Sequence, residues 1–291
     1  MTPYVADPVF LNGHFLPLAE AAISPLDRGF LYGDGVYEVI PVYSRRAFRI
    51  DEHLKRLQAT LDGIKLANPH TAAEWQAAIA SLIDSAPWED QSIYLQVTRG
   101  ADDKRDHAFP PASVRPTSLA FSSPLVTTPA EIRAQGVAAI TVPDQRWARC
   151  DLKVISLLAN VLARQQAVDE GCAEALLIRD GSLKEGAASN IFIVKDGLLL
   201  APPKTALMLP GITYDVILEL ADRHGQALEI REISETELRA ADEVWMTSST
   251  KEILAITTLD GAPVGNGQPG PLGKTMWQWY QDFKNTSMRK G

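Results

Sequence analysis

Four turn dipeptides place the strongest constraint on how this chain folds. Each is an Asn or Asp followed by Gly between short apolar runs: Asn12-Gly13, Asp180-Gly181, Asp196-Gly197 and Asp260-Gly261. Such pairs favour the type I′ turn of a two-residue β-hairpin, because both central residues of that turn need positive φ. Three of the four fall in the second half of the chain. That half is therefore predicted to be rich in antiparallel strands rather than in regular βαβ units.

Helical patterns separate the predicted strands. Apolar residues from position 54 to 64 recur at helical spacing after Asp51, which can cap the helix. A further helix is predicted to start near Asp151 or Lys153 and to end at Gly171. The fold class is therefore α+β, a mixture of helices and strands.

The length of 291 residues suits about two domains. Residues 122–129 carry two prolines and four hydroxyl side chains, which interrupt the periodic pattern. We therefore predict a small N-terminal domain at 1–121, a linker at 122–129 and a large cofactor-binding domain at 130–291.

Composition excludes several classes of protein. The net charge of −8 argues against a nucleic-acid binder, whose affinity depends on Lys and Arg. No apolar run reaches the roughly 18 residues that a membrane span requires, and the first residues lack the pattern of a signal peptide, so we expect a cytoplasmic protein. Cys150 and Cys172 have no spacing typical of a zinc site or a disulfide framework, and no metal is predicted.

Lys153 is the most informative single residue, because it stands among apolar neighbours. One interpretation is a surface lysine whose stem covers apolar groups while its amine reaches water. The other is a desolvated amine that loses its proton readily and forms a Schiff base. Pyridoxal 5′-phosphate is the commonest user of such a lysine. Its site needs an anion cradle, an acid beside the pyridine nitrogen and a grip on the substrate carboxylate.

The sequence offers candidates for the first two. Gly211-Ile212-Thr213 begins a helix, whose free N–H groups bind anions. The turn Thr247–Thr250 and Arg56 add further donors and charge, although each also fits an ordinary turn or a solvated helix residue. Glu185 precedes a run of small residues that permits close approach by a flat ligand, and an acid there would keep the pyridine nitrogen protonated.

Together these segments resemble the class IV, or branched-chain-type, pyridoxal-phosphate aminotransferases, and most closely the D-amino acid aminotransferases. The resemblance covers nearly the whole chain. The motifs that carry it are Asp27-Arg28-Gly29, Gly33 to Val39, Glu52-His53 with Arg56-Leu57, Gln96 to Gly100, Arg146-Trp147 with Arg149 to Lys153, Glu185-Gly186 with Ser189-Asn190, Gly211 to Thr213, and Thr247-Ser248 with Thr250 and Glu252.

The resemblance implies the fold and the roles of individual residues. It implies a small α/β sandwich domain and a larger domain with a barrel-like, antiparallel-rich sheet, with the cofactor between them. Lys153 would carry the cofactor as a Schiff base and shuttle the α-proton, and Glu185 would pair with the pyridine nitrogen. The residues implied around the rest of the cofactor are Arg56, Ile212, Thr213 and Ser249 at the phosphate, Leu209 against the ring, and Ser248 as a neighbour.

The subfamily depends on one loop. Lys104-Arg105-Asp106-His107 matches the Arg-x-His pair with which D-amino acid aminotransferases hold the α-carboxylate, together with a tyrosine at Tyr37. In that family the loop comes from the partner subunit, so the resemblance implies a homodimer. The loop also has equal numbers of acidic and basic residues, as a solvated loop does. Pro41, in a predicted strand, departs from the expected pattern and leaves the substrate range open.

The predicted activity is transfer of the amino group of a D-amino acid, such as D-alanine, to a 2-oxo acid, either 2-oxoglutarate or pyruvate. Alternatives within the superfamily are an (R)-amine transaminase, an L-branched-chain transaminase and a 4-amino-4-deoxychorismate lyase. A non-catalytic cofactor-binding scaffold is the alternative from a different class.

Overall fold

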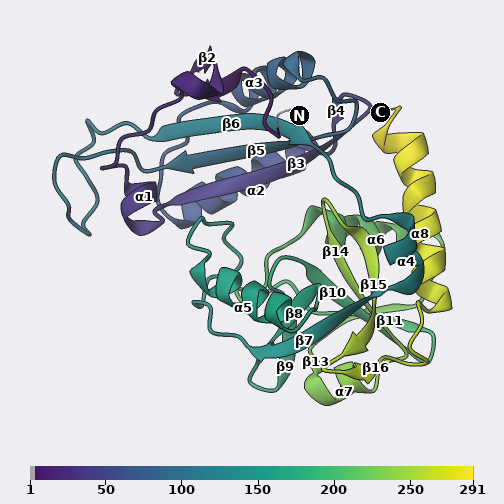
Figure 1. Cartoon of the computed structure of the whole chain (residues 1–291). Helices are drawn as coiled ribbons and strands as arrows, with labels where there is room; N and C mark the ends of the chain where they lie inside the picture. Colours follow the sequence, from purple (N-terminus) through teal and green to yellow (C-terminus); the bar gives the residue numbers. More distant parts are fainter. Residues whose placement is uncertain (1–3, 291) are drawn as a thin grey trace. The chain divides into compact units, whose positions relative to one another are not determined.

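The computed structural model describes residues 4–290, which divide into two units that each have their own sheet (Figure 1). Unit 1 contains the described residues up to Leu125 together with Leu152–Leu157. Unit 2 contains Val126–Asp151 and Leu158–Lys290. The predicted α+β class is confirmed. Leu152–Leu157 groups with unit 1 although it lies within 130–291, the range that the sequence assigned to the large domain.

Unit 1 is built on a six-stranded sheet with the order β2-β1-β6-β5-β3-β4. The paired strands are antiparallel throughout. In chain order its elements are β1 (Val9–Leu11), β2 (His14–Leu16), η1 (Leu18–Glu20), α1 (Arg28–Tyr32), β3 (Gly35–Tyr43), β4 (Arg46–Ala47), α2 (Ile50–Gly63), α3 (Ala72–Ser85), β5 (Gln91–Thr98) and β6 (Thr117–Pro124).

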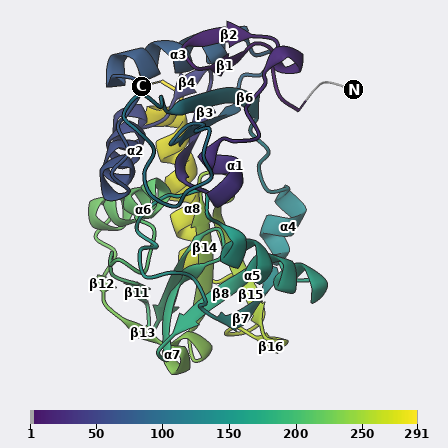
Figure 2. The same ribbon diagram turned by 90° about the vertical axis from the view of Figure 1, so that its left-hand side faces the viewer.

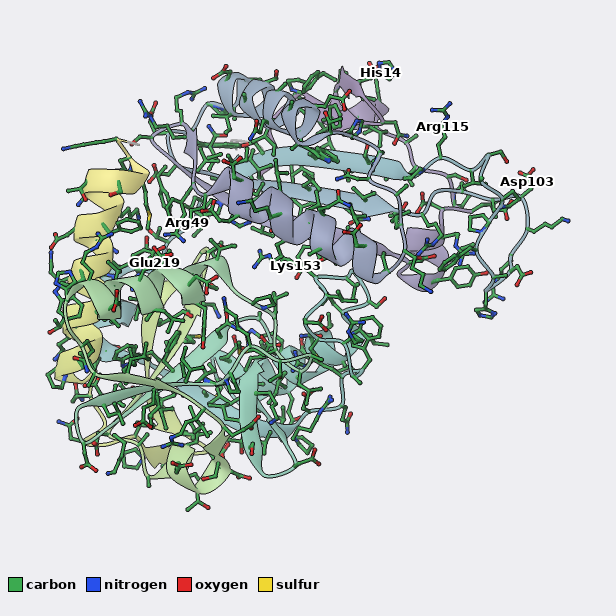
Figure 3. All side chains as sticks on the ribbon, turned by 180° about the vertical axis from the view of Figure 1, so that it is seen from behind. His14, Arg49, Asp103, Arg115, Lys153 and Glu219 are labelled. Atoms are coloured by element: carbon green, nitrogen blue, oxygen red, sulfur yellow. The ribbon has the colours of Figure 1, made fainter. Side chains whose placement is uncertain are left out.

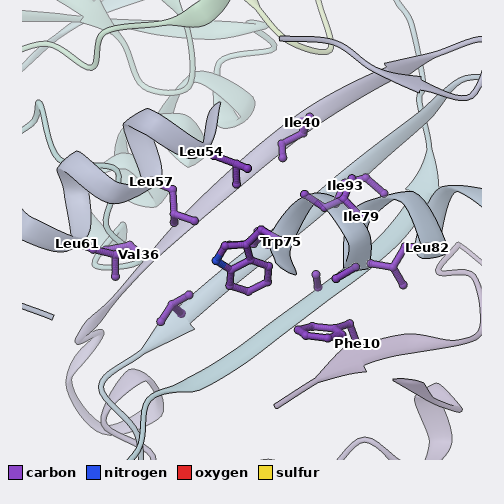
Figure 4. Packing of buried hydrophobic residues seen from close by; sticks show 14 of the residues in the cluster. Phe10, Val36, Ile40, Leu54, Leu57, Leu61, Trp75, Ile79, Leu82 and Ile93 are labelled. Atoms are coloured by element: carbon purple, nitrogen blue, oxygen red, sulfur yellow. The ribbon is translucent and has the colours of Figure 1, made fainter. Parts of the chain in front are cut away.

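The core of unit 1 lies between this sheet and two helices. Figures 1 and 2 show α2 and α3 together on one face of the sheet. Alternate residues of β3, including Val36 and Ile40, meet leucines of α2 and the fully buried Trp75 of α3 (Figure 4). This packing follows from the two periodicities: one face of each strand and one stripe of each helix are apolar.

The outer edge of β3 has two partners. β4 pairs with its C-terminal end, and Leu152–Leu157 pairs with its beginning. The carbonyl oxygen of Lys153 accepts a hydrogen bond from the amide of Tyr37 at 3.0 Å. The predicted helix start near Asp151 or Lys153 is therefore wrong. Strand pairing occupies this segment, and α5 begins at Leu158.

Pro41 lies inside β3 without a break in register, opposite Ser92 of β5. Its carbonyl oxygen accepts from the amide of Phe48, which lies beyond β4, on the outer side of the strand. Because the N–H and C=O of a strand residue point the same way, the missing N–H also faces this outer side. The position agrees with the edge environment that the sequence predicts.

Unit 2 contains a ten-stranded mixed sheet with the order β12-β11-β10-β14-β15-β7-β8-β9-β13, and β16 pairs with β15. Its elements are α4 (Ala130–Gln135), β7 (Val137–Pro143), α5 (Leu158–Asp169), β8 (Glu174–Arg179), β9 (Ser182–Gly186), β10 (Asn190–Lys195), β11 (Leu198–Ala201), α6 (Ile212–Arg223), β12 (Leu228–Ile230), β13 (Ile233–Ser234), α7 (Glu235–Arg239), β14 (Glu243–Ser248), β15 (Glu252–Leu259), β16 (Ala262–Pro263), α8 (Pro271–Phe283) and the π-helical turn η2 (Lys284–Met288).

The sheet of unit 2 curls around one apolar core. Side chains from strands far apart in the sheet, such as Leu200 of β11 and Leu183 of β9, belong to the same buried cluster. A flat sheet would keep them apart, so the sheet bends as barrels do. The other face of β14 carries Glu243 and the buried Trp245.

All four turn dipeptides form the predicted hairpins, between β1 and β2, β8 and β9, β10 and β11, and β15 and β16. Both central residues of each turn have positive φ. The predicted cap of α2 is wrong, because the residue before the helix is Arg49, while the Asp51 side chain accepts from Gln76 at 2.7 Å. No helix within residues 4–290 combines the length and apolarity needed to cross a membrane.

Candidate functional site

Lys153 belongs to unit 1 and lies against both β3 and α2 (Figure 3). Its amide is 3.4 Å from Oγ1 of Thr60 in α2, and its carbonyl oxygen is bound by Tyr37 in β3. Its Nζ lies 4.2 Å from the ring centroid of Tyr37. The structure therefore brings together two of the predicted site residues, Lys153 and Tyr37, and fixes the lysine backbone on two sides.

A buried ion-pair cluster adjoins this lysine. Glu38, the next residue of β3, accepts from Nε of Arg56 at 2.7 Å and from its Nη2 at 2.8 Å. Nδ1 of His53 lies 2.8 Å from the same carboxylate. The side chains of Glu38 and His53 have no exposed surface, and that of Arg56 is 10% exposed. Arg56, predicted from the sequence as a phosphate ligand, is thus held in a bidentate pair with a buried acid.

The cluster fixes the charges around Lys153. Burial alone would raise the pKa of Glu38, but the Arg56 guanidinium and the hydrogen bond from His53 hold it at about 2. Burial lowers the pKa of His53, and Arg56 and Lys153 add to this effect while Glu38 opposes it. We therefore assign His53 as neutral at pH 7 with its proton on Nδ1. Its Nε2 is buried and has no hydrogen-bond partner among residues 4–290.

Arg105 and His107 lie on the loop between β5 and β6, also in unit 1. Arg105 lies over the ring of Tyr32, with 5.3 Å between its Cζ and the ring centroid, and the His107 ring is 5.3 Å from the same ring. Figure 3 shows Asp103, on this loop, well away from Lys153. Within the described part of unit 1, the pair therefore clusters at Tyr32 rather than at its own Lys153.

Arg28 holds this loop in place. Its Nη1 donates to the carbonyl oxygens of Asp106 at 2.6 Å and Ala108 at 3.1 Å, and its Nη2 to that of His107 at 3.4 Å. Its Nε pairs with Asp34 at 2.9 Å, and the Arg28 side chain is 5% exposed. Charged donors on backbone carbonyls make strong hydrogen bonds, so a loop rich in solvated side chains has a defined path.

Glu185 lies on β9 of unit 2 and is 4% exposed. Its carboxylate forms an ion pair with Arg146. Arg146 in turn bonds both oxygens of Asp144, at 2.8 and 3.0 Å, and the carbonyl oxygen of Leu207 at 3.1 Å. Burial alone would lower the pKa of Arg146, but Asp144 and Glu185 raise it above its ordinary range. A permanent cation therefore accompanies Glu185, which favours the ionised carboxylate.

Glu185 is connected directly to the start of α6. The amide of Leu209 is 3.2 Å from each carboxylate oxygen, and Nδ2 of Asn190 is 3.3 Å from Oε2. Asn190 also donates to the Leu209 carbonyl at 3.0 Å. Gly211 packs so closely that an added Cβ would lie 2.0 Å from Oδ1 of Asn190. A glycine is required there, and it lets the helix start approach the acid.

The two groups of predicted phosphate donors in unit 2 lie at one end of its sheet. Ile212 and Thr213 form the first turn of α6, beside Asn190. Asn190 pairs with Thr247 of β14, and Ser248 and Ser249 follow that residue. Both donor groups therefore adjoin the first residue of β10, as a phosphate cradle requires.

A second partly buried lysine lies near this cradle. The amide of Lys251 donates to Oγ of Ser248 at 3.1 Å, and its Nζ is 3.8 Å from the buried Glu174. Burial lowers the pKa of Lys251, and Glu174 only partly opposes this. Lys251 is the obvious rival to Lys153 wherever an amine is invoked.

Sequence reasoning gave no role to Glu38, His53, Arg146 or Asn190, although each stood inside a quoted motif. A signal was present for the first of them. Glu38 shares the face of β3 that carries Val36 and Ile40, so period-2 alternation predicts a buried carboxylate that needs a cationic partner.

Comparison with known proteins gives the family. Residues 35–259 match the family model described as amino-transferase class IV. The chain is 38% identical to a D-alanine aminotransferase of Bacillus licheniformis, over 92% of this chain and 94% of that protein. It is 36% identical to a D-alanine aminotransferase of Listeria monocytogenes, over 94% of each. The chain belongs to the class IV aminotransferases and is a pyridoxal-phosphate-dependent enzyme.

Solved structures agree with this assignment. The branched-chain amino acid aminotransferase of Escherichia coli matches with a TM-score of 0.89 and 28% identity, covering 95% of this chain and 94% of that one. A second branched-chain amino acid aminotransferase, from the organism abbreviated T.th. and solved with pyridoxamine 5′-phosphate, matches with a TM-score of 0.89 and 27% identity, covering 98% and 95%.

The residues of this chain fit the cofactor. In unit 2 a buried acid with a permanent cationic partner suits a protonated pyridine nitrogen, and the close approach at Gly211 leaves the α6 start open for an anion. In unit 1 Lys153 offers an amine beside an aromatic ring.

Proposed function

We propose that this enzyme transfers the amino group of a D-amino acid, such as D-alanine, to a 2-oxo acid, 2-oxoglutarate or pyruvate, in a ping-pong cycle. The observation that carries the proposal is the Arg105–His107 pair, held on a loop that Arg28 ties down at three carbonyl oxygens. A planar guanidinium binds a carboxylate with two parallel hydrogen bonds. The position of that carboxylate decides which α-hydrogen faces the catalytic amine, and hence whether D- or L-amino acids react.

The proposal assigns the loop to the partner's site in a homodimer. Arg105 and His107 gather at Tyr32, away from Lys153 of their own chain, which supports this assignment. Tyr37, beside Lys153, would complete the carboxylate site from the other subunit. Both cysteines are free thiols, which supports a cytoplasmic location.

Bound pyridoxal phosphate supplies an electron sink that makes the α-hydrogen of the substrate acidic. Lys153 would hold the cofactor covalently and then, once released, take the α-proton at its Nζ and return it. Glu185, kept ionised by Arg146, would accept the pyridine N–H. The phosphate would be held by Ile212, Thr213, Ser249 and Arg56, with Ser248 beside them and Leu209 against the ring.

Neutral His53 would help Lys153 to act as a base. A protonated imidazole next to the lysine would add positive charge, whereas the neutral ring places only a buried lone pair there. Glu38 fixes this tautomer, and Arg56 fixes Glu38. The cluster therefore has a proposed electrostatic role beyond holding α2 on β3.

Product chirality tests the proposal. Purified enzyme is incubated with D-alanine or L-leucine and 2-oxoglutarate, and the enantiomers of glutamate are resolved. D-Glutamate from D-alanine is expected. Turnover of L-leucine alone would contradict it and favour a branched-chain aminotransferase, an activity that the similarity to branched-chain enzymes makes the leading alternative.

An Arg105→Ala variant tests the loop. It should lose activity on α-amino acids far more than on simple amines, because only the former carry the carboxylate. Equal losses on both would remove the basis for the D-specific proposal and favour an (R)-amine transaminase.

A further inference from the structure

A pocket of about 740 Å³ lies in unit 2, between α4, β15 and α8. Its walls come from the chain after Val126, from α4, from β15 and from α8, the yellow helix of Figure 1. None of the residues assigned to the cofactor lines it. The volume lies within the range of about 300–1,000 Å³ typical of small-molecule sites.

The lining is mostly apolar around a charged base. Ile253, Trp277 and Pro129 supply apolar surface, and the buried Trp245 lies beneath. α8 reaches this depth because Gly273 has no side chain: an added Cβ would lie 2.7 Å from Nε1 of Trp245. The pocket is therefore formed by close packing of α8 on β14 and is not a gap between loosely packed elements.

Cations exceed carboxylates in the pocket, although the whole chain has a net charge of −8. The charged lining residues are Arg133, Lys274, Lys284 and a single acid, Glu252. Glu252 is 3% exposed and already accepts from Lys284 at 2.6 Å and from Gln281 at 2.9 Å. The pocket has more positive charge than its own acid can neutralise.

Arg133 is the cation left with the least compensation at the base. Its side chain is 16% exposed, and its nearest approach to the Glu252 carboxylate is 3.7 Å. Its Nη1 donates to the carbonyl oxygen of Ile253, which fixes the guanidinium, and its Cζ lies 5.2 Å from the Trp277 ring centroid. Burial lowers the pKa of Arg133, and Glu252 opposes this only in part. A buried guanidinium in this position favours an anionic partner.

Two further features point to a ligand with acceptor atoms. Nε1 of Trp277 is buried with no acceptor among residues 4–290. Lys284 begins the π-helical turn η2, and such turns occur often at binding sites. The lining is thus rich in donors and poor in acceptors.

We propose that this pocket binds a small organic carboxylate with an aromatic or branched aliphatic body. The carboxylate pairs with Arg133, and the body lies against Trp277 and Ile253. The site is distinct from the cofactor site, and the proposal does not depend on the transamination proposed above.

The test is a ¹⁹F NMR titration of the holoenzyme with 4-fluorobenzoate. The titrations use an Arg105→Gln background, so that the substrate-carboxylate loop contributes no binding. Saturable binding at one site per chain is expected, and 4-fluorobenzamide, which has the same shape without the charge, should bind at least about tenfold more weakly. Absence of saturation up to about 10 mM, or equal binding of the amide, would overturn the proposal.

Variants locate the site. Arg133→Gln should weaken binding at least about tenfold, whereas Arg133→Lys, which keeps the charge, should cost less. Ala134→Phe, on the exposed side of α4, should fill the pocket and abolish binding even if Arg133→Gln fails to fold. Arg231→Gln removes an exposed arginine elsewhere in unit 2 and should change nothing. Unchanged titrations in both Arg133→Gln and Ala134→Phe would place the ligand elsewhere and refute the assignment.

Discussion

Replacing Arg56 by Met should expose the energetic cost of the buried cluster in unit 1. The substitution keeps most of the side-chain volume but removes the guanidinium that binds both oxygens of Glu38. The carboxylate then stays fully buried with His53 as its remaining partner in the cluster. Such a group must either ionise without compensation or take up a proton.

The structure gives the size of the effect. The pKa of Glu38 is lowered from 4.5 to about 2. At about 1.4 kcal/mol per pH unit, that corresponds to about 3 kcal/mol of stability at neutral pH. Glu38 has no exposed surface, so no reduction for solvent screening applies. Removal of one partner from a buried pair typically costs about 3–5 kcal/mol, which agrees with this figure.

Urea unfolding of the apoprotein at pH 7 measures this cost without any contribution from bound cofactor. We expect Arg56→Met to lose about 3 kcal/mol, and Glu38→Gln in the same chain to recover much of that loss. Arg231→Met, at an exposed ion pair, is the matched control and should cost less than about 1 kcal/mol. Additive losses in the Arg56→Met/Glu38→Gln pair would refute the reasoning.

The same experiment has a pH signature. Because the folded pKa of Glu38 lies below its ordinary value, its contribution is complete above about 4.5 and is lost as pH falls toward 2. Wild type should therefore lose stability across this window more steeply than Arg56→Met, in which the carboxyl no longer has a lowered pKa. Equal slopes would show that Arg56 does not hold the charge of Glu38.

Three further substitutions test other parts of the site. Gly211→Ala should displace Asn190 from the helix start and weaken cofactor binding by about tenfold or more, measured by titration of the apoenzyme with pyridoxal phosphate, and unchanged affinity would contradict the close contact. Arg146→Met should lower kcat by about 10- to 100-fold by releasing Glu185, with cofactor still bound, and a normal kcat would show that Glu185 needs no cationic partner. Arg28→Met should raise KM for D-alanine by about tenfold while kcat changes less, because the loop loses its anchors, and a loss confined to kcat would count against this role.

Features determined by local chain chemistry were predictable from the sequence. The four hairpins depend only on residues that tolerate positive φ, and all four formed. The apolar stripe from Leu54 to Leu61 packs against β3, as its spacing predicts. The helix start at Gly211 and the strand carrying Glu185 also followed from local pattern.

Features that depend on distant pairing were not predictable. The segment with Lys153 looks helical by its apolar spacing, but it pairs with β3, more than one hundred residues away in the chain. The pairing of Arg56 with Glu38 was missed for a similar reason, since an arginine on a helix face looks solvated until a buried strand carboxylate is placed opposite. Tertiary contacts decided both cases over local propensity.

The half-reaction of the holoenzyme with D-alanine or L-leucine, without a 2-oxo acid, tests the central proposal most directly. D-Alanine should release one pyruvate per bound cofactor and convert the absorbance of the Schiff-base form to that of the aminated form, while L-leucine leaves the spectrum unchanged. Lys153→Ala should abolish the reaction, and Lys251→Ala, the matched lysine control, should retain it. Conversion by L-leucine alone, or full conversion by Lys153→Ala, would contradict the account.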